Sequence, residues 1–381
     1  ATAVGLSHAV LSIIYMQGER NGDLKIYEWD SATVALSVAI SSFTTNLIQL
    51  ANDYNTDCAV VTGQPRRIPF FTYQTASQPA AQAQLNAADT GMDIFMVGPH
   101  YACPAAINGS LNGGGNPNWG DPIHKSADGE RWYGLQVGKV MRRAIFEMER
   151  WRGLRPLSAV KVDNNTFDVL FEVPRPPLVI DTAFLAKCVG YGFNVNSGSI
   201  DAPVGSVSIT NALVIGPNTV RFTTGVTLPS GAWLAAGSSA ACDLGVTSNV
   251  SAVGTGAATP YGQATYTVTV PGDLRNLVKP LTNEGAFYIA QSGGRTGIIR
   301  AVSWDGSNTV FTGETRERSA TNFVTGSPIT FGRSHVYTNL RDSDPELSVY
   351  TFADSSYPSY STRYPLWNWC CLFINLPIIG A

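Results

Sequence analysis

The first 155 residues alternate apolar runs with helical stretches, and this order constrains the fold more than any other feature of the chain. Apolar runs at residues 10–16, 58–62 and 93–97 predict three strands. Apolar side chains at helical spacing behind a polar cap predict a helix over residues 31–54, and an Ala- and Gln-rich run predicts another over 77–88. This alternation indicates a parallel sheet with helices on both faces, in which ligands bind beyond the carboxyl ends of the strands.

From about residue 157 the pattern changes to short β-type runs separated by Gly, Asn, Pro and Ser. Asn164-Asn165 and Asp305-Gly306 are hairpin-type turn signals between such runs. Strands at this spacing predict a β-sandwich or jelly roll. The runs are residues 160–163, 166–173, 206–210, 219–223, 264–270, 286–291, 298–304 and 348–352. We therefore expect two domains, an α/β domain at residues 1–155 and a β-sandwich domain at 156–381 that serves glycan binding or assembly.

The composition argues against several classes of function. A net charge of −3 with 14% charged residues gives no basic surface for nucleic acid. No uninterrupted apolar run approaches the length of about 18 residues that a membrane span needs. The six cysteines have no CxxC or Cys/His spacing, so the sequence predicts neither a metal site nor a cofactor, and Cys370 and Cys371 are expected to be buried free thiols. The Gly-, Ser-, Thr- and Asn-rich second half is typical of extracellular β proteins and virion fibres.

The sequence DPIH at residues 121–124 lies in a Gly-, Asn- and Pro-rich stretch before a helix predicted over residues 126–151. A serine hydrolase needs an imidazole as base and a carboxylate that orients it. Because Asp121 and His124 are three residues apart on one predicted loop, His124 is the candidate base and Asp121 its partner. The alternative is a helix-capping Asp beside a surface His. The preceding α/β pattern and the helix that follows the motif favour the catalytic interpretation, as does the match of Gly129 to the family that the motifs resemble, described next.

A second motif, QGE at residues 17–19, begins where the strand at 10–16 ends. Together the two motifs resemble the SGNH/GDSL hydrolases, and among them the carbohydrate O-acetylesterases of the sialate type that occur in phage tailspikes and fibres and in secreted bacterial esterases. The resemblance implies an SGNH-type parallel sheet and a serine esterase. It also implies that Gln17, Gly18 and Glu19 line the oxyanion pocket, with the Gln17 amide as a donor to the developing charge.

Other interpretations of these polar residues stay open. Gln17 caps a turn and Glu19 pairs with an arginine if neither touches substrate. His100, at the predicted end of the third strand, either lines the cleft or is a hydrogen-bonded structural histidine. Residues 339–343 (NLRDS) predict a structural turn with an Arg–Asp pair, and His335 is predicted to be structural. Core packing or a sugar platform explains an aromatic cluster near the end of the chain, formed by Tyr357, Tyr360, Tyr364, Trp367 and Trp369.

The Gly-Asp-Ser block that carries the nucleophile in this family does not occur in the chain. Ser7 has a glycine close before it, but it precedes the strand at residues 10–16 instead of following a strand. We therefore expect an upstream segment or a separate chain to supply the serine, so that the domain at 1–155 is the C-terminal part of the SGNH fold. A degenerate, non-catalytic descendant is the alternative.

The function expected from the sequence is removal of O-acetyl groups from a polysaccharide or surface glycan. The resemblance places such an enzyme outside the cell or in a virion tail, as a fibre or tailspike. The rival expectation is a non-catalytic glycan-binding or virion structural protein on an esterase scaffold. A fibre would be expected to form a homo-trimer, although no heptad pattern indicates one.

Overall fold

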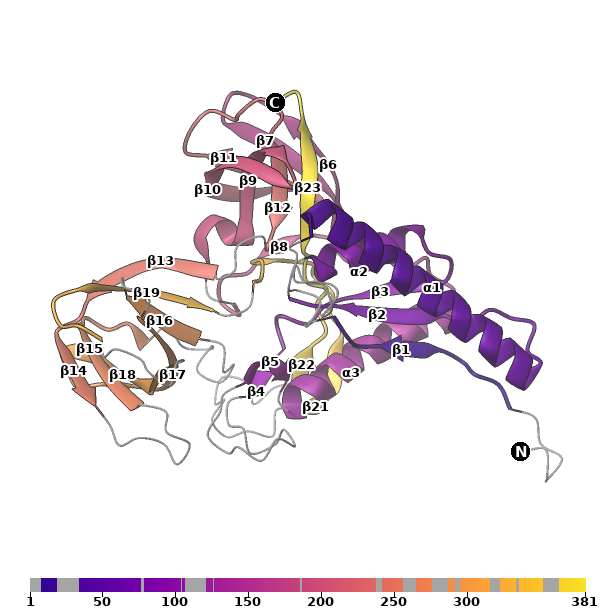
Figure 1. Cartoon of the computed structure of the whole chain (residues 1–381), viewed down its shortest axis with the longest axis horizontal. Helices are drawn as coiled ribbons and strands as arrows, with labels where there is room; N and C mark the ends of the chain where they lie inside the picture. The colour runs from indigo at the N-terminus through magenta and orange to yellow at the C-terminus, as the bar shows by residue number, and fades with distance from the viewer. Residues whose placement is uncertain are drawn as a thin grey trace.

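The computed structural model shows a mixed α/β protein with three parts: an α/β layer, a closed β-barrel and a seven-stranded sheet (Figure 1). The residues that it describes are 8–18, 34–76, 79–103, 105–106, 121–125, 127–185, 187–237, 242–255, 265–275, 287–291, 295–315, 323–333, 336–351 and 363–381. For Asp121 to His124 it describes the backbone alone.

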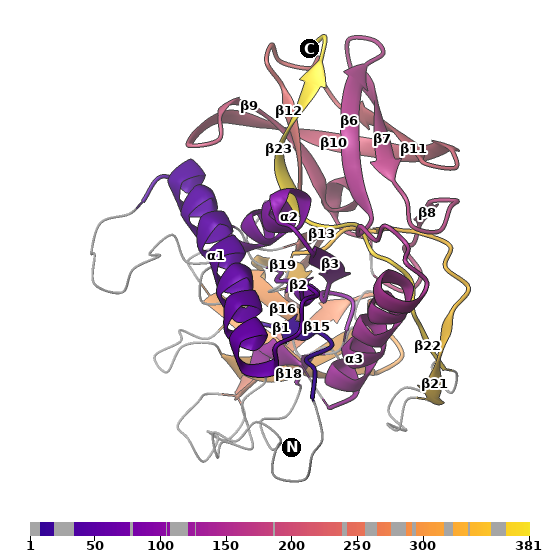
Figure 2. The same ribbon diagram turned by 90° about the vertical axis from the view of Figure 1, so that its right-hand side faces the viewer.

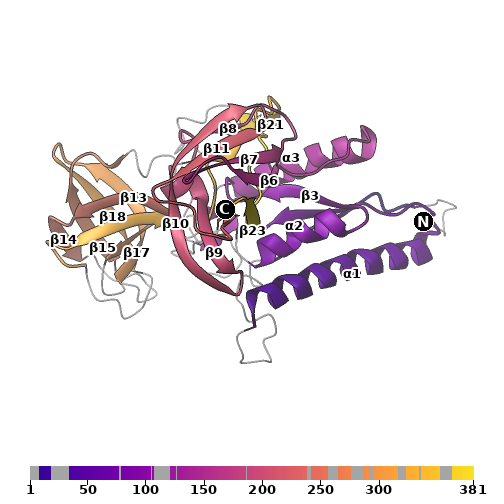
Figure 3. The same ribbon diagram turned by 90° about the horizontal axis from the view of Figure 1, so that it is seen from above.

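The α/β layer contains a three-stranded parallel sheet in the order β1-β2-β3. Its strands are β1 (Ile13–Tyr15), β2 (Phe70–Gln74) and β3 (Ile94–Pro99). The connecting helices α1 (Leu36–Thr62) and α2 (Ala80–Thr90) cover one face, and α3 (Ala127–Met141) covers the other (Figures 2 and 3). Every residue of β2 is buried, as a central strand between two helical layers requires.

The prediction of a strand at residues 58–62 is wrong, because this run forms the last turns of α1. Val60 and Val61 are 80% and 70% exposed on the helix surface, and Gly63 ends the helix with φ 67°. The middle strand is β2 instead, about ten residues further along the chain. Gln64, which follows the helix, binds both backbone polar groups of Val10 through its side chain.

A short hairpin and a helix complete this layer. β4 (Ala105–Ala106) pairs with β5 (Asp121–Lys125), which runs into α3 after one residue. A π-helical turn, η3 (Arg142–Phe146), ends this helix earlier than the predicted residue 151. No helix within the described ranges is both long enough and apolar enough to cross a bilayer.

Seven strands close into a barrel in the order β10-β11-β7-β6-β23-β12-β9. The last strand of the chain, β23, closes it by pairing parallel to β6 and antiparallel to β12. The barrel interior is apolar and includes Phe167, Val169, Val220 and Phe222, which are fully buried. The barrel strands are β6 (Arg155–Lys161), β7 (Thr166–Glu172), β9 (Phe193–Ser199), β10 (Ala202–Gly216), β11 (Thr219–Thr224), β12 (Trp233–Ala236) and β23 (Phe373–Ile379).

The seven-stranded antiparallel sheet has the order β13-β19-β16-β17-β18-β15-β14. Its two edge strands are joined by Val250 and Ser251 alone, so the sheet must curl until its edges approach each other. The expected β-rich character is present, but it is divided between a closed barrel and this curled sheet. The strands are β13 (Cys242–Asn249), β14 (Ala252–Thr255), β15 (Thr265–Pro271), β16 (Phe287–Gln291), β17 (Arg295–Trp304), β18 (Asn308–Thr315) and β19 (Pro328–Arg333).

Residues 336–351 and 363–372 follow this sheet in the chain and contact both other parts. The Gln74 side chain binds the backbone N–H and C=O of Leu372, and the Tyr101 hydroxyl donates to the carbonyl of Cys370. These bonds join the end of the chain to the α/β layer. Short elements in and beside this region are β8 (Val179–Ile180), the 3₁₀ turn η4 (Val189–Gly192), β20 (Leu340–Arg341), β21 (Leu347–Thr351) and β22 (Arg363–Pro365).

Candidate functional site

The carboxyl ends of the three parallel strands meet at one edge of the sheet, which we call the strand-end site. Gln17 and Gly18 follow β1, Thr75 follows β2, and His100 follows β3. The strand pairing fixes this arrangement, because parallel strands in register end side by side.

Gln84 of α2 joins two of these strand ends. Its Nε2 donates to the Gln17 carbonyl at 3.0 Å, and its Oε1 accepts from the Thr75 N–H at 2.8 Å. Gln84 is fully buried, so the bond to Thr75 is shielded from water, while the bond to the exposed Gln17 is partly so. A Cβ on Gly18 would lie 2.9 Å from the Gln84 Nε2, so this close approach requires glycine. Gln84 is not among the residues predicted from the sequence, although a glutamine on the Ala-rich, buried face of a helix is a signal that could have identified it.

The Gln17 side chain is exposed and its Oε1 accepts a bond from the Tyr15 hydroxyl at 3.0 Å. This contact orients the amide, because an occupied oxygen leaves the Nε2 end as the donor to a ligand. Gly18 is buried beside it. Glu19 and Ser7 lie outside the described residues, as does His335.

Thr75 places a further polar group at this edge. Its side chain is fully buried, and its Oγ1 has no hydrogen-bond partner among the described residues. Its methyl group is 3.5 Å from the position of a Cβ on Gly18, so the hydroxyl belongs to the same site as the QGE block. Buried hydroxyls without a partner are rare in folded proteins and mark positions where a further group can bind.

His100 is buried, with 3% of its surface exposed. Its Nδ1 lies 3.0 Å from the Gln74 carbonyl, and its ring packs against Tyr73 and edge-on against Tyr133. Burial lowers the pKa of His100 well below its usual value, the charge of Lys125 lowers it further, and the bond to Gln74 opposes both. The ring is therefore neutral at pH 7 and donates from Nδ1, which ties the end of β3 to the end of β2.

The DPIH motif lies in β5 and not in the predicted loop. Its pairing with β4 is irregular: Lys125 lies opposite Ala105, and Asp121 lies opposite Ala106. Ala105 and Ala106 are adjacent in β4, whereas their partners in β5 are four positions apart. The three residues between these partners, Pro122 to His124, therefore form a bulge. Bulges of this kind often adjoin active sites, where they redirect a side chain.

Lys125 fixes this bulge to the end of β3. Its side chain is buried and its Nζ donates to the Cys103 carbonyl at 3.1 Å. Gly129, in the first turns of α3, is buried as well. The residue next to His124 is therefore anchored three residues beyond His100, at the same edge of the sheet.

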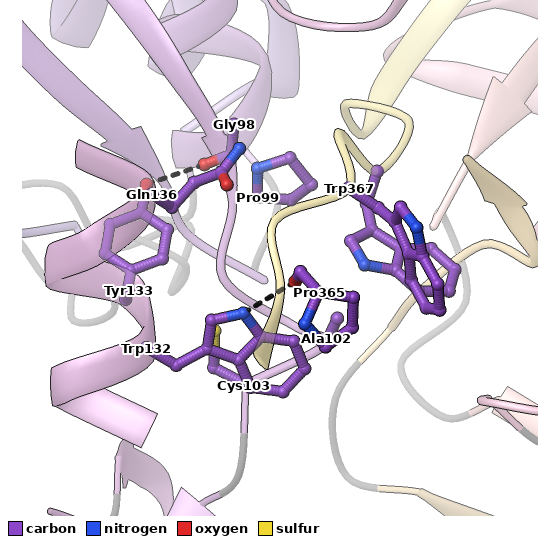
Figure 4. A pocket seen from close by; sticks show the side chains of 10 residues that line it. Gly98, Pro99, Ala102, Cys103, Trp132, Tyr133, Gln136, Pro365 and Trp367 are labelled. Carbon is purple, nitrogen blue, oxygen red and sulfur yellow. Dashed lines mark hydrogen bonds between the residues drawn. The ribbon is translucent and has the colours of Figure 1, made fainter. Parts of the chain in front are cut away.

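A small pocket opens beside the end of β3 (Figure 4). It lies between Gly98 and Pro99 on one side and Trp132 of α3 and Trp367 on the other. The Trp132 indole donates to the Pro365 carbonyl at 2.9 Å, so α3 and the C-terminal segment form one wall. The free space is about 20 Å³, room for about one water molecule.

The aromatic cluster near the end of the chain packs into the core at the positions that the structure describes. Tyr364 is fully buried and Trp369 is 5% exposed, while Tyr357 and Tyr360 lie outside the described residues. The arginine of the NLRDS segment pairs with Asp181 at 2.7 Å and stacks on Trp367 at 3.7 Å. The predicted Arg–Asp pair is thus made with an aspartate far away in the sequence.

Cys58, Cys103, Cys188, Cys370 and Cys371 are free thiols, and of these Cys370 and Cys371 are fully buried, as expected. Burial raises the pKa of the Cys371 thiol to about 12, so it stays protonated at neutral pH. In the parts of the chain that the structure describes, no cluster of His, Cys, Asp and Glu side chains could hold a metal ion.

No protein-family model and no curated protein matches the sequence. A weak structural neighbour is the N-terminal part of the bacterial S-layer protein SbsC, with a TM-score of 0.18 and 12% sequence identity. The alignment covers 54% of this chain and 50% of that one, so the chain spans about half the length of that protein. A TM-score this low supports no statement about fold or function.

Proposed function

We propose that the protein is a serine esterase of the SGNH type that removes O-acetyl groups from a polysaccharide or surface glycan. In this proposal His124 is the base and Asp121 orients it, while Gln17 donates to the oxyanion. The serine comes from a segment upstream of the numbered chain or from a second chain. The enzyme acts outside the cell or as part of a virion tail, as a fibre or tailspike and, for a fibre, as a homo-trimer.

The observation that carries the proposal is the bulge at the DPIH motif. Extra residues in β5 fall at Pro122 to His124, and the next residue, Lys125, is tied to the end of β3. The motif thus lies at the edge of the sheet where parallel-strand proteins bind their ligands. The QGE block adds support, since Gln84 and Tyr15 hold Gln17 at that same edge.

The proposed chemistry requires each of these groups. The imidazole takes the proton from the serine and returns it to the leaving alcohol, and the carboxylate stabilises the imidazolium that forms. An amide donor such as that of Gln17 stabilises the negative charge on the ester oxygen, an interaction worth about 3 kcal/mol of barrier in comparable sites.

The alternative is a glycan-binding or virion structural protein that keeps the fold without the reaction. A Gly-Asp-Ser block upstream in the parent gene would favour the esterase, and its absence there would favour this alternative. An assay of ester hydrolysis distinguishes the esterase from this non-catalytic alternative.

The test measures hydrolysis of p-nitrophenyl acetate and of an O-acetylated polysaccharide by the native full-length protein and by His124→Ala. We expect the variant to lose at least about 10²-fold in kcat, because general base catalysis contributes that much or more. His8→Ala, at an exposed position, is the matched control and should keep full activity. Absence of activity in the native protein, or equal activity in His124→Ala, would refute the proposal.

A further inference from the structure

A groove of about 610 Å³ lies between α1, α2 and the end of the barrel, and it shares no lining residue with the strand-end site. Figures 1 and 3 show the two helices beside β23, which forms the third wall through Ile374 and Asn375 together with Ile200 in the turn between β9 and β10. Its volume falls within the range of about 300–1,000 Å³ that is typical of ligand sites. The hairpin between β9 and β10 is held against α1 by Asp201, which accepts bonds from the backbone N–H and hydroxyl of Ser37. The groove is therefore fixed on all three sides.

Hydroxyls and amides dominate the lining. The hydroxyls of Thr44, Thr45 and Thr90 each donate to the carbonyl four residues earlier in their own helix, at 2.8 to 3.0 Å. Each oxygen is thereby free to accept a bond from a ligand. The Asn86 side chain supplies an amide, whose Oδ1 is occupied by Gln82 Nε2 at 2.7 Å, so its NH₂ group is the end that can donate.

The groove carries little net charge. Asp89 is its one charged lining residue, and this carboxylate pairs with Arg155 and, at 3.7 Å, with Arg152. Neither arginine lines the groove, and no lysine or histidine does. A phosphate or carboxylate ligand would therefore meet no cation there, whereas a neutral ligand would meet donors and acceptors.

A bulge in β23 brings one more amide to the groove. The β12 residues Leu234 and Ala236 pair with Leu376 and Phe373, so β23 has one extra residue between these pairs. Asn375 lies in this bulge with φ 65°, is exposed, and lines the groove. The floor beside it is apolar, formed by Ile374 with Ile40 of α1.

We propose that this groove binds an uncharged, hydroxyl-rich ligand, a stretch of a neutral polysaccharide. Sugar hydroxyls would pair with the threonine oxygens and the two asparagine amides, and the apolar face of a sugar ring would rest on the isoleucines. The site is separate from the proposed ester hydrolysis and does not depend on it.

The test is affinity electrophoresis of the full-length protein through gels that contain dextran, galactomannan or xylan, with alginate as the anionic comparison. We expect retardation in at least one of the neutral gels and none in alginate. Thr45→Trp, which fills the groove, should abolish the retardation, while Thr56→Trp on the exposed part of α1 serves as the matched control and should migrate like the native protein.

A second variant keeps the test valid if the tryptophan disturbs packing. Asn375→Gly removes the amide and keeps a residue that tolerates the positive φ, so the fold should be unaffected. Loss of one hydrogen bond should weaken binding about 2- to 10-fold. The proposal is overturned if none of the three neutral gels retards the protein, if alginate retards it equally, or if both groove variants migrate like the native protein.

Discussion

At the scale of single residues, Gln84 is the side chain on which the strand-end site depends most directly. It is fully buried and is the one contact described between the Gln17 carbonyl and the Thr75 N–H. Gln84→Leu keeps the volume but leaves these two groups without their partner. We expect the free energy of unfolding to fall by about 1–3 kcal/mol, the usual cost of an unsatisfied buried polar group, as measured by urea denaturation.

The matched control for this change is Gln49→Leu, at an exposed position of α1, which should alter stability by less than about 0.5 kcal/mol. If the esterase proposal holds, Gln84→Leu should also lower kcat more than it raises KM, because Gln17 acts on the transition state. Equal stability of Gln84→Leu and the native protein would show that the two strand ends do not need this link.

The residues that lie at the strand-end site can be predicted from the sequence more readily than the side chains whose hydrogen bonds hold them in place. Gln17, Gly18 and His100 stand at strand ends because apolar runs precede them, a pattern that is local and readable. Gln84 and Lys125 were missed, because their roles depend on carbonyl groups that only the folded sheet brings near. The three extra residues at the DPIH motif could not be foreseen either, since a bulge is defined by its partner strand.

At the scale of elements, a short apolar run was predicted to be a strand but forms part of a helix. Residues 58–62 read as a strand because Val60 and Val61 are β-branched, yet their exposure shows that they extend α1. Periodicity alone cannot separate a short buried strand from a helix turn. By contrast β2, with aromatic residues at Phe70, Phe71 and Tyr73 between turn signals, carried a strand signal that was passed over.

A buried ionic cluster attaches α3 to the C-terminal segment. The Lys139 ammonium is fully buried and donates to Asp344 at 3.1 Å, to Asn368 at 2.9 Å and to the Leu366 carbonyl. The pKa of Lys139 is lowered to about 8, because burial and, to a smaller extent, the charge of Arg143 lower it by more than the two aspartates nearby raise it. Burial raises the pKa of Asp344, but the charges of Lys139 and Arg143 and the hydrogen bonds from Lys139 and the Glu346 N–H together outweigh it, so the pKa is lowered.

The lowered pKa of Lys139 makes the free energy of unfolding depend on pH. Between pH 8 and its ordinary pKa of 10.5, the unfolded chain holds a proton that folded Lys139 has lost, so its contribution to stability rises with pH. The difference in unfolding free energy between native protein and Lys139→Met should therefore shift in favour of the native protein across that window, by on the order of 3 kcal/mol. Urea titrations at a series of pH values measure it. Lys161→Met on the barrel is the control, and a pH-independent difference for Lys139→Met would contradict the assignment.

At the scale of the whole molecule, segments far apart in the sequence close the barrel and join the end of the chain to the α/β layer. The helices end and the barrel begins near Arg155, but the barrel needs β23 from the last nine residues, and the Gln74 amide needs Leu372. Turn and strand patterns cannot reveal such pairings between distant segments, because a closing strand is specified by its partners and not by its own sequence. The curled sheet, in contrast, leaves the barrel after Gly237 and returns at Val336, and these two residues lie close together, since a Cβ on Gly237 would be 3.1 Å from the Val336 side chain.

This connectivity predicts opposite outcomes for two deletions. A fragment of residues 1–155 should not fold, because it buries Lys139 and Gln74 without the C-terminal groups that satisfy them, a loss of several hydrogen bonds worth about 1–3 kcal/mol each. A chain in which a short Gly/Ser linker replaces residues 238–335 should fold, because the linker spans ends that already lie close together and its closure entropy is small. Circular dichroism and urea unfolding measure both, and the expected result is a cooperative transition for the second chain and none for the first. A folded 1–155 fragment would show that the contacts with residues 336–372 are dispensable, and an unfolded second chain would show that the curled sheet is part of the same cooperative unit as the barrel.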